Sequence, residues 1–200
     1  MPSNSAIKFA NRISELLYLR ASSSDLRLRP IREVQKQIYL HSYLAGIVAA
    51  WDSYIKSIVK EHFTLVSNPL DVRYHSIYSL LKDYADQSIK KLNTPNADNA
   101  RNFLISSVGY DPLGDWIWTT RAYTAQATRE RLNEIFHVRH SFAHGFTMPS
   151  YSWNTSSTGK TRLTLVSVDD SRELLKYLVQ STDIGISRNL QNVHSIMTGW

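Results

Sequence analysis

The chain has 200 residues and no cysteine, which excludes a disulfide scaffold, a thiolate nucleophile and any zinc site with cysteine ligands. Hydrophobic residues make up 42% and charged residues 20%, values that are ordinary for a globular protein and argue against long disorder. The net charge of +6 favours an anionic partner but does not distinguish nucleic acid from other anions.

The N-terminal segment has the apolar spacing of a helix from about residue 4 to residue 20. Its Arg- and Ser-rich run up to Pro30 also resembles an organellar transit peptide, but Ile13, Leu16 and Leu17 have helix-core spacing, so we favour an ordinary helix. The longest apolar stretch, residues 45–51, is far shorter than the roughly 20 residues of a membrane span. We therefore expect a cytoplasmic protein with no membrane partner.

Two long helices are expected next. Pro30 suits the first turn of a helix whose apolar positions continue to Phe63, with Gly46 as a possible break. Residues 67–69 would end this helix, and a third helix is predicted over about 70–92. Its apolar positions are Val72, Ile77, Leu80, Leu81, Tyr84, Ile89 and Leu92.

The second half of the chain is also helical in pattern. A short helix is expected over about 99–108 with Gly109 closing it, followed by an aromatic loop or single turn over 110–118. A strongly amphipathic helix over 124–146, a loop over 147–164 and a last helix over 169–193 complete the chain. Residues 163–168 alternate like a short strand, but no second run pairs with them. The sequence thus predicts a single all-α domain over residues 1–200, with antiparallel long helices and short peripheral ones.

The helix predicted over 124–146 carries the residues that look most like chemistry. His137, His140 and His144 fall within eight residues of one another. The apolar stripe of this helix consists of Leu132, Ile135, Phe136, Phe142, Ala143 and Phe146. Arg139 takes a position on that stripe where an apolar residue is expected, and a guanidinium there is costly unless it is paired or opens to a cleft.

Two readings of Arg139 remain open on spacing alone. It is either a structural arginine paired with Glu130 or Glu134, or a functional group. His144 lies five residues further on, about 140° around an ideal helix, so the two side chains flank the stripe. They can act on one group if the helix ends near Gly145, or if a second copy packs against this edge about a two-fold axis.

The segment Arg139-His-Ser-Phe-Ala-His144-Gly145 resembles the R-x4-6-H motif of the HEPN superfamily (higher eukaryotes and prokaryotes nucleotide-binding). That motif has a polar residue after the Arg, and often a small residue before the His and a Gly after it. His140, Ala143 and Gly145 fill these three places. The long helix around Trp51 and the helix start at residues 95–99 also resemble the layout of stand-alone HEPN proteins of this length.

The resemblance implies a HEPN-like helical bundle that forms a homodimer through the motif helix, with Arg139 and His144 as a catalytic pair that cleaves RNA without metal or cofactor. Histidine titrates near neutral pH and can accept or donate the proton that 2′-OH attack requires. Arginine can hold a phosphate through two parallel hydrogen bonds. The expected products carry 2′,3′-cyclic phosphate and 5′-OH ends.

The resemblance further implies a toxin or defence effector, with a possible antitoxin or regulatory protein as a partner. The alternative is a non-catalytic HEPN module that binds nucleotide, RNA or a partner protein. Some family toxins carry a Tyr two residues after the motif His, which a partner enzyme nucleotidylates. This chain has Phe146 there, which has no hydroxyl, so silencing by that route is not expected.

Four further residues are expected to support the pair or to bind RNA: His140, His137, Ser141 and Arg131. Arg131 to His137 also spells R-x5-H, but Leu132 follows that Arg where a polar residue is expected, and Val138 follows that His in place of Gly. The three clustered histidines share a helix face compatible with metal ligation, but no carboxylate completes the set, so no metal is expected.

The tryptophans and the N-terminal charge give weaker indications of where RNA would bind. Trp51 is expected in the core. Trp116 and Trp118 are also expected in the core on balance, but they lie beside Arg121 and are the best candidates for stacking on a base. Residues 1–40 hold seven basic and three acidic groups, so most of the charge excess lies there. We expect this N-terminal part to help hold RNA, with an affinity that weakens as salt rises.

Overall fold

The structure is a computed structural model, and it describes residues 1–22, 33–67 and 72–200. Within these ranges the chain is all-α, with two isolated β-bridges and no strand. Two single 3-10 turns, η2 (Pro112–Gly114) and η3 (Thr119–Arg121), lie between the fourth and fifth helices. The helices are α1 (Asn4–Ser22), α2 (Glu33–Leu65), α3 (Val72–Lys91), α4 (Ala97–Val108), α5 (Ala125–Ala143) and α6 (Leu165–His194).

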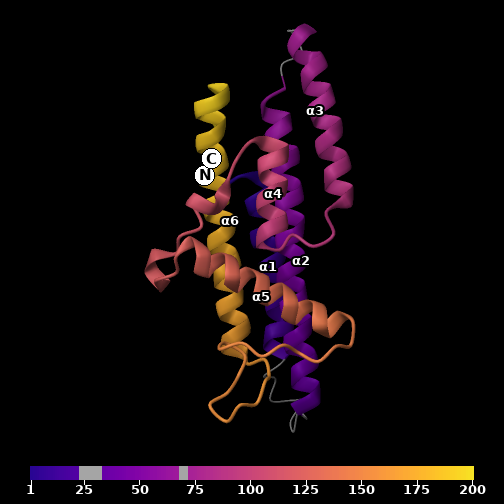
Figure 1. Cartoon of the computed structure of the whole chain (residues 1–200), viewed down its shortest axis with the longest axis vertical. Helices are drawn as coiled ribbons and strands as arrows, with labels where there is room; N and C mark the ends of the chain where they lie inside the picture. The colour runs from indigo at the N-terminus through magenta and orange to yellow at the C-terminus, as the bar shows by residue number, and fades with distance from the viewer. Residues whose placement is uncertain (23–32, 68–71) are drawn as a thin grey trace.

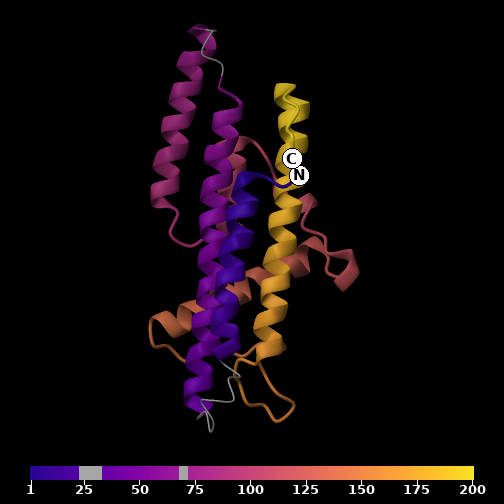
Figure 2. The ribbon, with the colours of Figure 1, turned by 180° about the vertical axis from the view of Figure 1, so that it is seen from behind.

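Three helices, α1, α2 and α6, lie side by side along the long axis of the molecule (Figure 1). α1 runs antiparallel to α2 and α6, and α3 and α4 pack beside the C-terminal half of α2. α5 crosses one face of this bundle obliquely, as the view from behind also shows (Figure 2). None of the described helices combines the length and the hydropathy that a membrane crossing requires.

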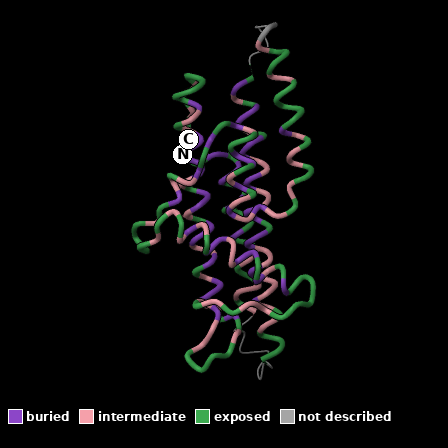
Figure 3. Tube along the Cα trace, viewed as in Figure 1, coloured by how far each residue is buried: buried purple, intermediate pink, exposed green. Residues whose placement is uncertain are grey.

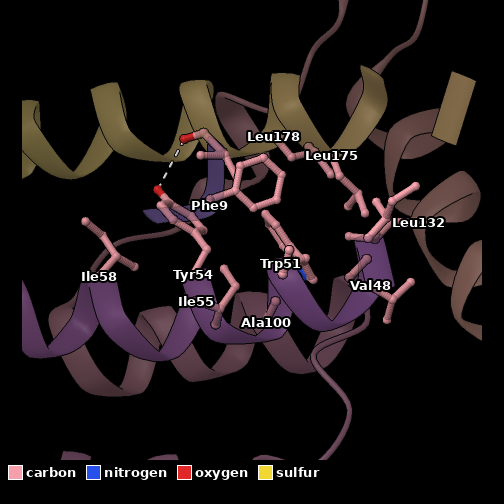
Figure 4. Packing of buried hydrophobic residues seen from close by; sticks show 14 of the residues in the cluster. Phe9, Val48, Trp51, Tyr54, Ile55, Ile58, Ala100, Leu132, Leu175 and Leu178 are labelled. Atoms are coloured by element: carbon pink, nitrogen blue, oxygen red, sulfur yellow. Dashed lines mark hydrogen bonds between the residues drawn. The ribbon is translucent and has the colours of Figure 1, made fainter. Parts of the chain in front are cut away.

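The core forms around α2, which is buried by α1 and α6 on one side and by α4 and α5 on the other. Figure 4 shows Trp51 packed among side chains of α1, α5 and α6. Trp51 is fully buried, and its Nε1 donates a hydrogen bond to the Pro95 carbonyl at 2.8 Å. The sequence-based expectation that Trp51 belongs to the core is therefore confirmed.

Helix α2 runs without a break through Gly46. A Cβ atom at Gly46 would collide with the side chain of Leu16, so α1 approaches α2 closely at this point. Glycine here serves close packing of two helices and does not interrupt α2. The expected roles of Pro30 and of residues 67–69 fall wholly or partly outside the described residues, as do three of the seven basic residues of the N-terminal part.

The alternating segment 163–168 is not a strand, because α6 begins at Leu165. Thr164 is its N-cap: its Oγ1 accepts a hydrogen bond from the Ser167 N–H at 3.1 Å, and the Ser167 hydroxyl accepts one from the Thr164 N–H at 3.0 Å. The polar positions that produced the alternation are thus the two halves of a capping box. The short helix α4 begins after its N-cap Asn96 and ends at Gly109, which has φ +67°.

Helix α3 is less buried than its apolar spacing predicts. Along most of its length the described side chains are exposed or half-buried, as Figure 3 shows. Ala85 is buried, and Tyr78, Ile89 and Leu92 pack against the core from its edge. The exposed apolar side chains are those of Ile77, Leu80, Leu81 and Tyr84. These apolar positions stay uncovered because α3 lies at the outside of the bundle, with neighbours on one side only.

Candidate functional site

Helix α5 carries the candidate site. It begins at Ala125 after the N-cap Thr124, whose Oγ1 accepts a hydrogen bond from the Ala127 N–H at 3.1 Å. Its middle is anchored by fully or nearly fully buried apolar side chains. These are Leu132, Ile135, Phe136 and Val138. The helix is therefore fixed on the bundle by its middle turns, while its last turn reaches the edge.

The C-terminus of α5 is a Schellman motif centred on Gly145. The helix ends at Ala143 and not at Phe146 as predicted, and His144 is the C-cap with φ −107°. Gly145 has φ +68°, a left-handed conformation that glycine adopts without steric cost. The Phe146 N–H then donates to the Ser141 carbonyl at 2.8 Å, and the Gly145 N–H donates to the Phe142 carbonyl at 3.4 Å. The glycine after the motif histidine thus ends the helix at that histidine.

This ending groups three rings at the surface. The ring centres of His140 and His144 lie 4.2 Å apart, and the Phe146 ring lies 5.8 Å from that of His144 and 6.1 Å from that of His140. All three residues are exposed. The two imidazoles therefore lie against each other at the exposed end of α5.

Arg139 lies on the same last turns of α5 and is half-buried. Among the described residues it forms no hydrogen bond or ion pair. The pairing with Glu130 or Glu134 is absent there, because these residues lie nine and five positions before Arg139 and only residues three or four apart face each other on a helix. Glu130 accepts a hydrogen bond from Gln126, and Glu134 accepts one from Trp153. The Arg139 guanidinium is thus left for another partner.

The expected apolar stripe is wrong in its last third. Phe142 is 42% exposed and Phe146 63% exposed, and Ala143 is exposed as well. Val138 and Ser141 instead face the core, because the last turn of α5 extends past the bundle edge and only one side of it is covered. Phe142 stacks on His41 of α2, with ring centres 4.3 Å apart and planes within 5°. Burial lowers the pKa of His41.

The other expected site residues do not join this group. Ser141 is buried, and its hydroxyl donates to the Val138 carbonyl at 2.8 Å. His137 is exposed, with its Nδ1 atom 2.9 Å from the Tyr151 hydroxyl oxygen. Arg131 is 8% exposed, and its guanidinium carbon lies 3.6 Å from the centre of the Trp153 ring. The structure therefore brings Arg139, His140 and His144 onto one end of α5 and leaves Arg131 and His137 with separate aromatic partners.

Those partners come from the 147–164 loop, in which the sequence indicates no functional residue. Tyr151 and Trp153 stack with parallel rings 6.4 Å apart. The Trp153 Nε1 donates to Glu134 Oε2 at 3.0 Å, so the loop folds back along α5. The only sequence signal for this return was the presence of large aromatic residues in an otherwise polar loop.

Trp116 is not available for stacking on a base. It is fully buried, its ring meets that of Trp51, and its Nε1 donates to the Thr182 hydroxyl at 3.0 Å. Trp118 is half-buried and stacks on Tyr177, with ring centres 5.2 Å apart. Across the described ranges, no group of three or more His, Asp or Glu side chains is placed to hold a metal ion.

An all-helical bundle with an R-x4-H-G segment at the end of a helix is the arrangement that the resemblance to the HEPN superfamily implies. The family model described as RiboL-PSP-HEPN matches residues 7–188, and the chain belongs to this family. The comparison with curated proteins and the comparison with solved structures each gave no match. Family membership indicates a nuclease-like or nucleotide-binding module.

Proposed function

We propose that the protein is a homodimeric, metal-independent endoribonuclease in which Arg139 and His144 form the catalytic pair. The observation that carries this proposal is the arrangement at the end of α5. Two exposed imidazoles lie 4.2 Å apart at the end of α5, and the last turns of that helix also carry Arg139, which is half-buried and has no hydrogen-bond or ion-pair partner among the described residues. RNA cleavage by the neighbouring 2′-OH requires a cation and two proton-transfer groups, and this end of the helix offers residues of both kinds.

In this reaction the 2′-oxygen attacks the phosphorus and the bond to the 5′-oxygen breaks. The 2′-OH proton passes to one imidazole, and the 5′-oxygen leaves with a proton from another. His144 fills one of these roles, and His144 of a second copy or the neighbouring His140 fills the other. The Arg139 guanidinium binds the phosphoryl oxygens, where negative charge increases in the transition state. The products are 2′,3′-cyclic phosphate and 5′-OH ends.

The exposed apolar surface around the motif supports a homodimer. Phe142 in the last turn of α5 and Phe146 just after its end flank His144, and Phe142 stacks on His41. Val34 and Ile38 share a helix face with His41 on α2 and are 71% and 49% exposed. Exposed apolar side chains gathered beside polar ones are typical of an interaction surface. A two-fold axis through this surface would bring two copies of the motif together.

The catalytic test compares single variants with matched controls on a single-stranded RNA in the presence of a chelator. Arg139→Ala and His144→Ala should each lower the cleavage rate by roughly 10²-fold or more, with unchanged circular dichroism. Arg188→Ala on α6 and His75→Ala on α3 replace exposed residues of the same types outside the site and should leave the rate unchanged. Equal cleavage by all four variants would refute the proposed function.

The dimer is tested by Phe146→Asp, which places a charge on the exposed apolar surface while leaving the core untouched. Sedimentation should show a dimer for the unaltered chain and a monomer for the variant, and cleavage should fall with dimer content. RNA binding without cleavage by the unaltered protein would favour the alternative, a non-catalytic HEPN module.

The proposal extends to a toxin or defence effector held in check by an antitoxin or regulatory protein. Expression of the unaltered chain should then slow growth, whereas expression of His144→Ala should not. Equal growth of cells that express the two proteins at the same level would contradict this role.

A further inference from the structure

Basic side chains gather on the outer surface of α1 and α2, outside the motif. A groove of about 440 Å³ lies between these two helices, and we call it the α1/α2 groove. Its charged lining residues are Arg12 of α1 and Asp52, Lys56 and Lys60 of α2. The proposed cleavage chemistry uses none of them.

Most of the basic groups at this groove have no partner within the chain. Arg12 and Lys60 are exposed, and neither forms a hydrogen bond or an ion pair within the described ranges. Lys8 lies one helical turn before Arg12 and is also exposed and unpaired in that part of the chain. Lys56 is paired with Asp52 at 2.9 Å, so these two charges offset each other. Three basic side chains are therefore left to bind an external anion.

Two further carboxylates on these helices do not cancel this excess. Glu61 accepts hydrogen bonds from the N–H groups of Asn4 and Ser5 at 3.0 Å each, so it serves the positive N-terminus of α1. Glu15 lies one turn after Arg12 and is exposed, but it does not line the groove. Within the described ranges it forms no ion pair with Arg12. Three unpaired basic groups thus stand against one unpaired carboxylate.

The floor of the groove consists of small side chains. Ala49, Ser53 and Ser57 line it and follow one another at four-residue spacing, so they form one ridge of α2. The Ser57 hydroxyl donates to the Tyr54 carbonyl at 3.2 Å, whereas the Ser53 hydroxyl has no hydrogen-bond partner in the described part of the chain. Serine hydroxyls, like arginine and lysine, are common ligands of the phosphate oxygens of nucleic acids.

We propose that the α1/α2 groove binds the phosphate backbone of the RNA strand beyond the cleavage site. This step rests on the proposed ribonuclease function, which makes RNA the anion that the protein must hold. An extended anion fits because basic groups lie on both helices that border the groove. No aromatic side chain is among the described residues that line it, so no base can stack there. The groove should therefore hold RNA of any sequence.

The ridge that forms the floor leads back to the motif. Steps of four residues back from Ser53 reach Ala49, Ala45 and His41, and His41 stacks on Phe142 near the end of α5. His41 and Ser53 are roughly 18 Å apart along the axis of α2. Seen from behind, α1 lies against α2, and the end of α5 projects past the edge of α2 (Figure 2). A strand bound at the motif can therefore continue along α2 into the groove, a few nucleotides from the cut.

The binding test is made in a His144→Ala background, so that the RNA stays intact. A labelled, unstructured single-stranded RNA is titrated by fluorescence anisotropy at several salt concentrations. The double variant Arg12→Gln/Lys60→Gln removes two unpaired charges from the groove. The double variant Lys90→Gln/Lys91→Gln is the matched control, because it removes the same charge from exposed positions of α3 that lie outside the groove.

The groove variant should bind RNA about tenfold more weakly than the background protein. Its plot of log affinity against log salt should be less steep by about 1.4, since each phosphate contact to a single strand contributes about 0.7. The control should bind within twofold of the background protein, with the same slope. A groove variant that binds like the control, or an equal loss in both variants, would overturn the proposal. Equal competition by polyglutamate at the same charge would overturn the assignment to RNA and indicate an acidic protein partner.

The link to cleavage is measured with the catalytically intact chain on two substrates. A dinucleotide is too short to reach from the motif into the groove, whereas a long strand occupies both. The ratio of kcat/KM for the long strand to that for the dinucleotide should fall about tenfold in the groove variant, through a higher KM for the long strand. An unchanged ratio would separate the groove from the RNA path and overturn this part of the proposal. Groove-dependent RNA binding without cleavage by the unaltered chain would leave the groove assignment standing and refute the ribonuclease.

Discussion

His62 gives the clearest prediction for stability. It lies in α2, is 3% exposed, and both its ring nitrogens are buried without a hydrogen-bond partner among the described residues. Its ring meets those of Phe63 and His194 edge to face. Burial, and secondly the nearby His194, lower the pKa of His62 from 6.5 to about 4.

The sign of the effect follows from proton uptake. As the pH falls below 6.5, the unfolded chain takes up a proton at residue 62 while the folded chain does not, so the folded state loses stability. The loss continues until the pH reaches about 4 and is then complete. At 1.36 kcal/mol for each pKa unit, it amounts to about 3 kcal/mol, a large share of the 5–15 kcal/mol typical of a domain.

The assay measures the free energy of unfolding by denaturant at pH 7, 6, 5 and 4 for the unaltered chain and for His62→Leu. Contributions from other groups cancel in the difference between the two proteins. That difference should move by about 3 kcal/mol in favour of the leucine variant between pH 7 and pH 4. His75→Leu, at an exposed position, should show no such change. A pH-independent difference for His62→Leu would refute the reasoning.

Two glycine positions yield further predictions, each checked by denaturant unfolding. Gly145→Ala should cost about 1–2 kcal/mol, because an alanine at Gly145 would have to adopt φ +68°. Gly114→Ala is the control and should cost less. A Cβ atom at either position meets no atom within 4 Å, so the two substitutions differ in that only Gly145 has a positive φ. Equal costs would contradict the assigned left-handed turn. Gly46→Ala forces the end of the Leu16 side chain to shift, at a cost of about 1–3 kcal/mol, while alanine gains roughly 1 kcal/mol over glycine inside a helix, so the net cost should be at most about 2 kcal/mol. Adding Leu16→Ala should make Gly46→Ala much less costly, and an unchanged cost in that background would rule out the collision as its cause.

Most of the fold could be predicted from the sequence because helix formation depends on local spacing and end signals. The long course of α2 follows from its apolar spacing, and the end of α4 at Gly109 follows from an end signal. What could not be predicted was which apolar faces are covered. Ile77 and Leu80 have the spacing of core residues, but burial depends on distant elements, and only one side of α3 has neighbours.

The site was also predictable only in part, because local signals mark the end of its helix but not which distant elements contact it. Gly145 after His144 is a helix-ending signal like Gly109, but the apolar Phe146 extended the predicted helix beyond it. Arg139 is half-buried and has no partner in the described part of the chain, and both facts depend on how far the last turn of α5 extends past its neighbours. Trp153 of the 147–164 loop likewise reaches Glu134 only through the path of the loop. A loop that folds back on a helix leaves no periodic trace in the sequence.

The position of α6 in the chain has a consequence for synthesis on the ribosome. The motif helix α5 leaves the ribosome before α6, because the chain is made from its N-terminus. Yet α6 supplies Leu175 and Leu178 beside Trp51 (Figure 4), and it supplies Ser171, which receives a hydrogen bond from Arg131. The core that carries α5 is therefore incomplete until α6 has been made. A nascent chain that ends before Leu165 has the full motif but lacks one wall of the bundle that supports it.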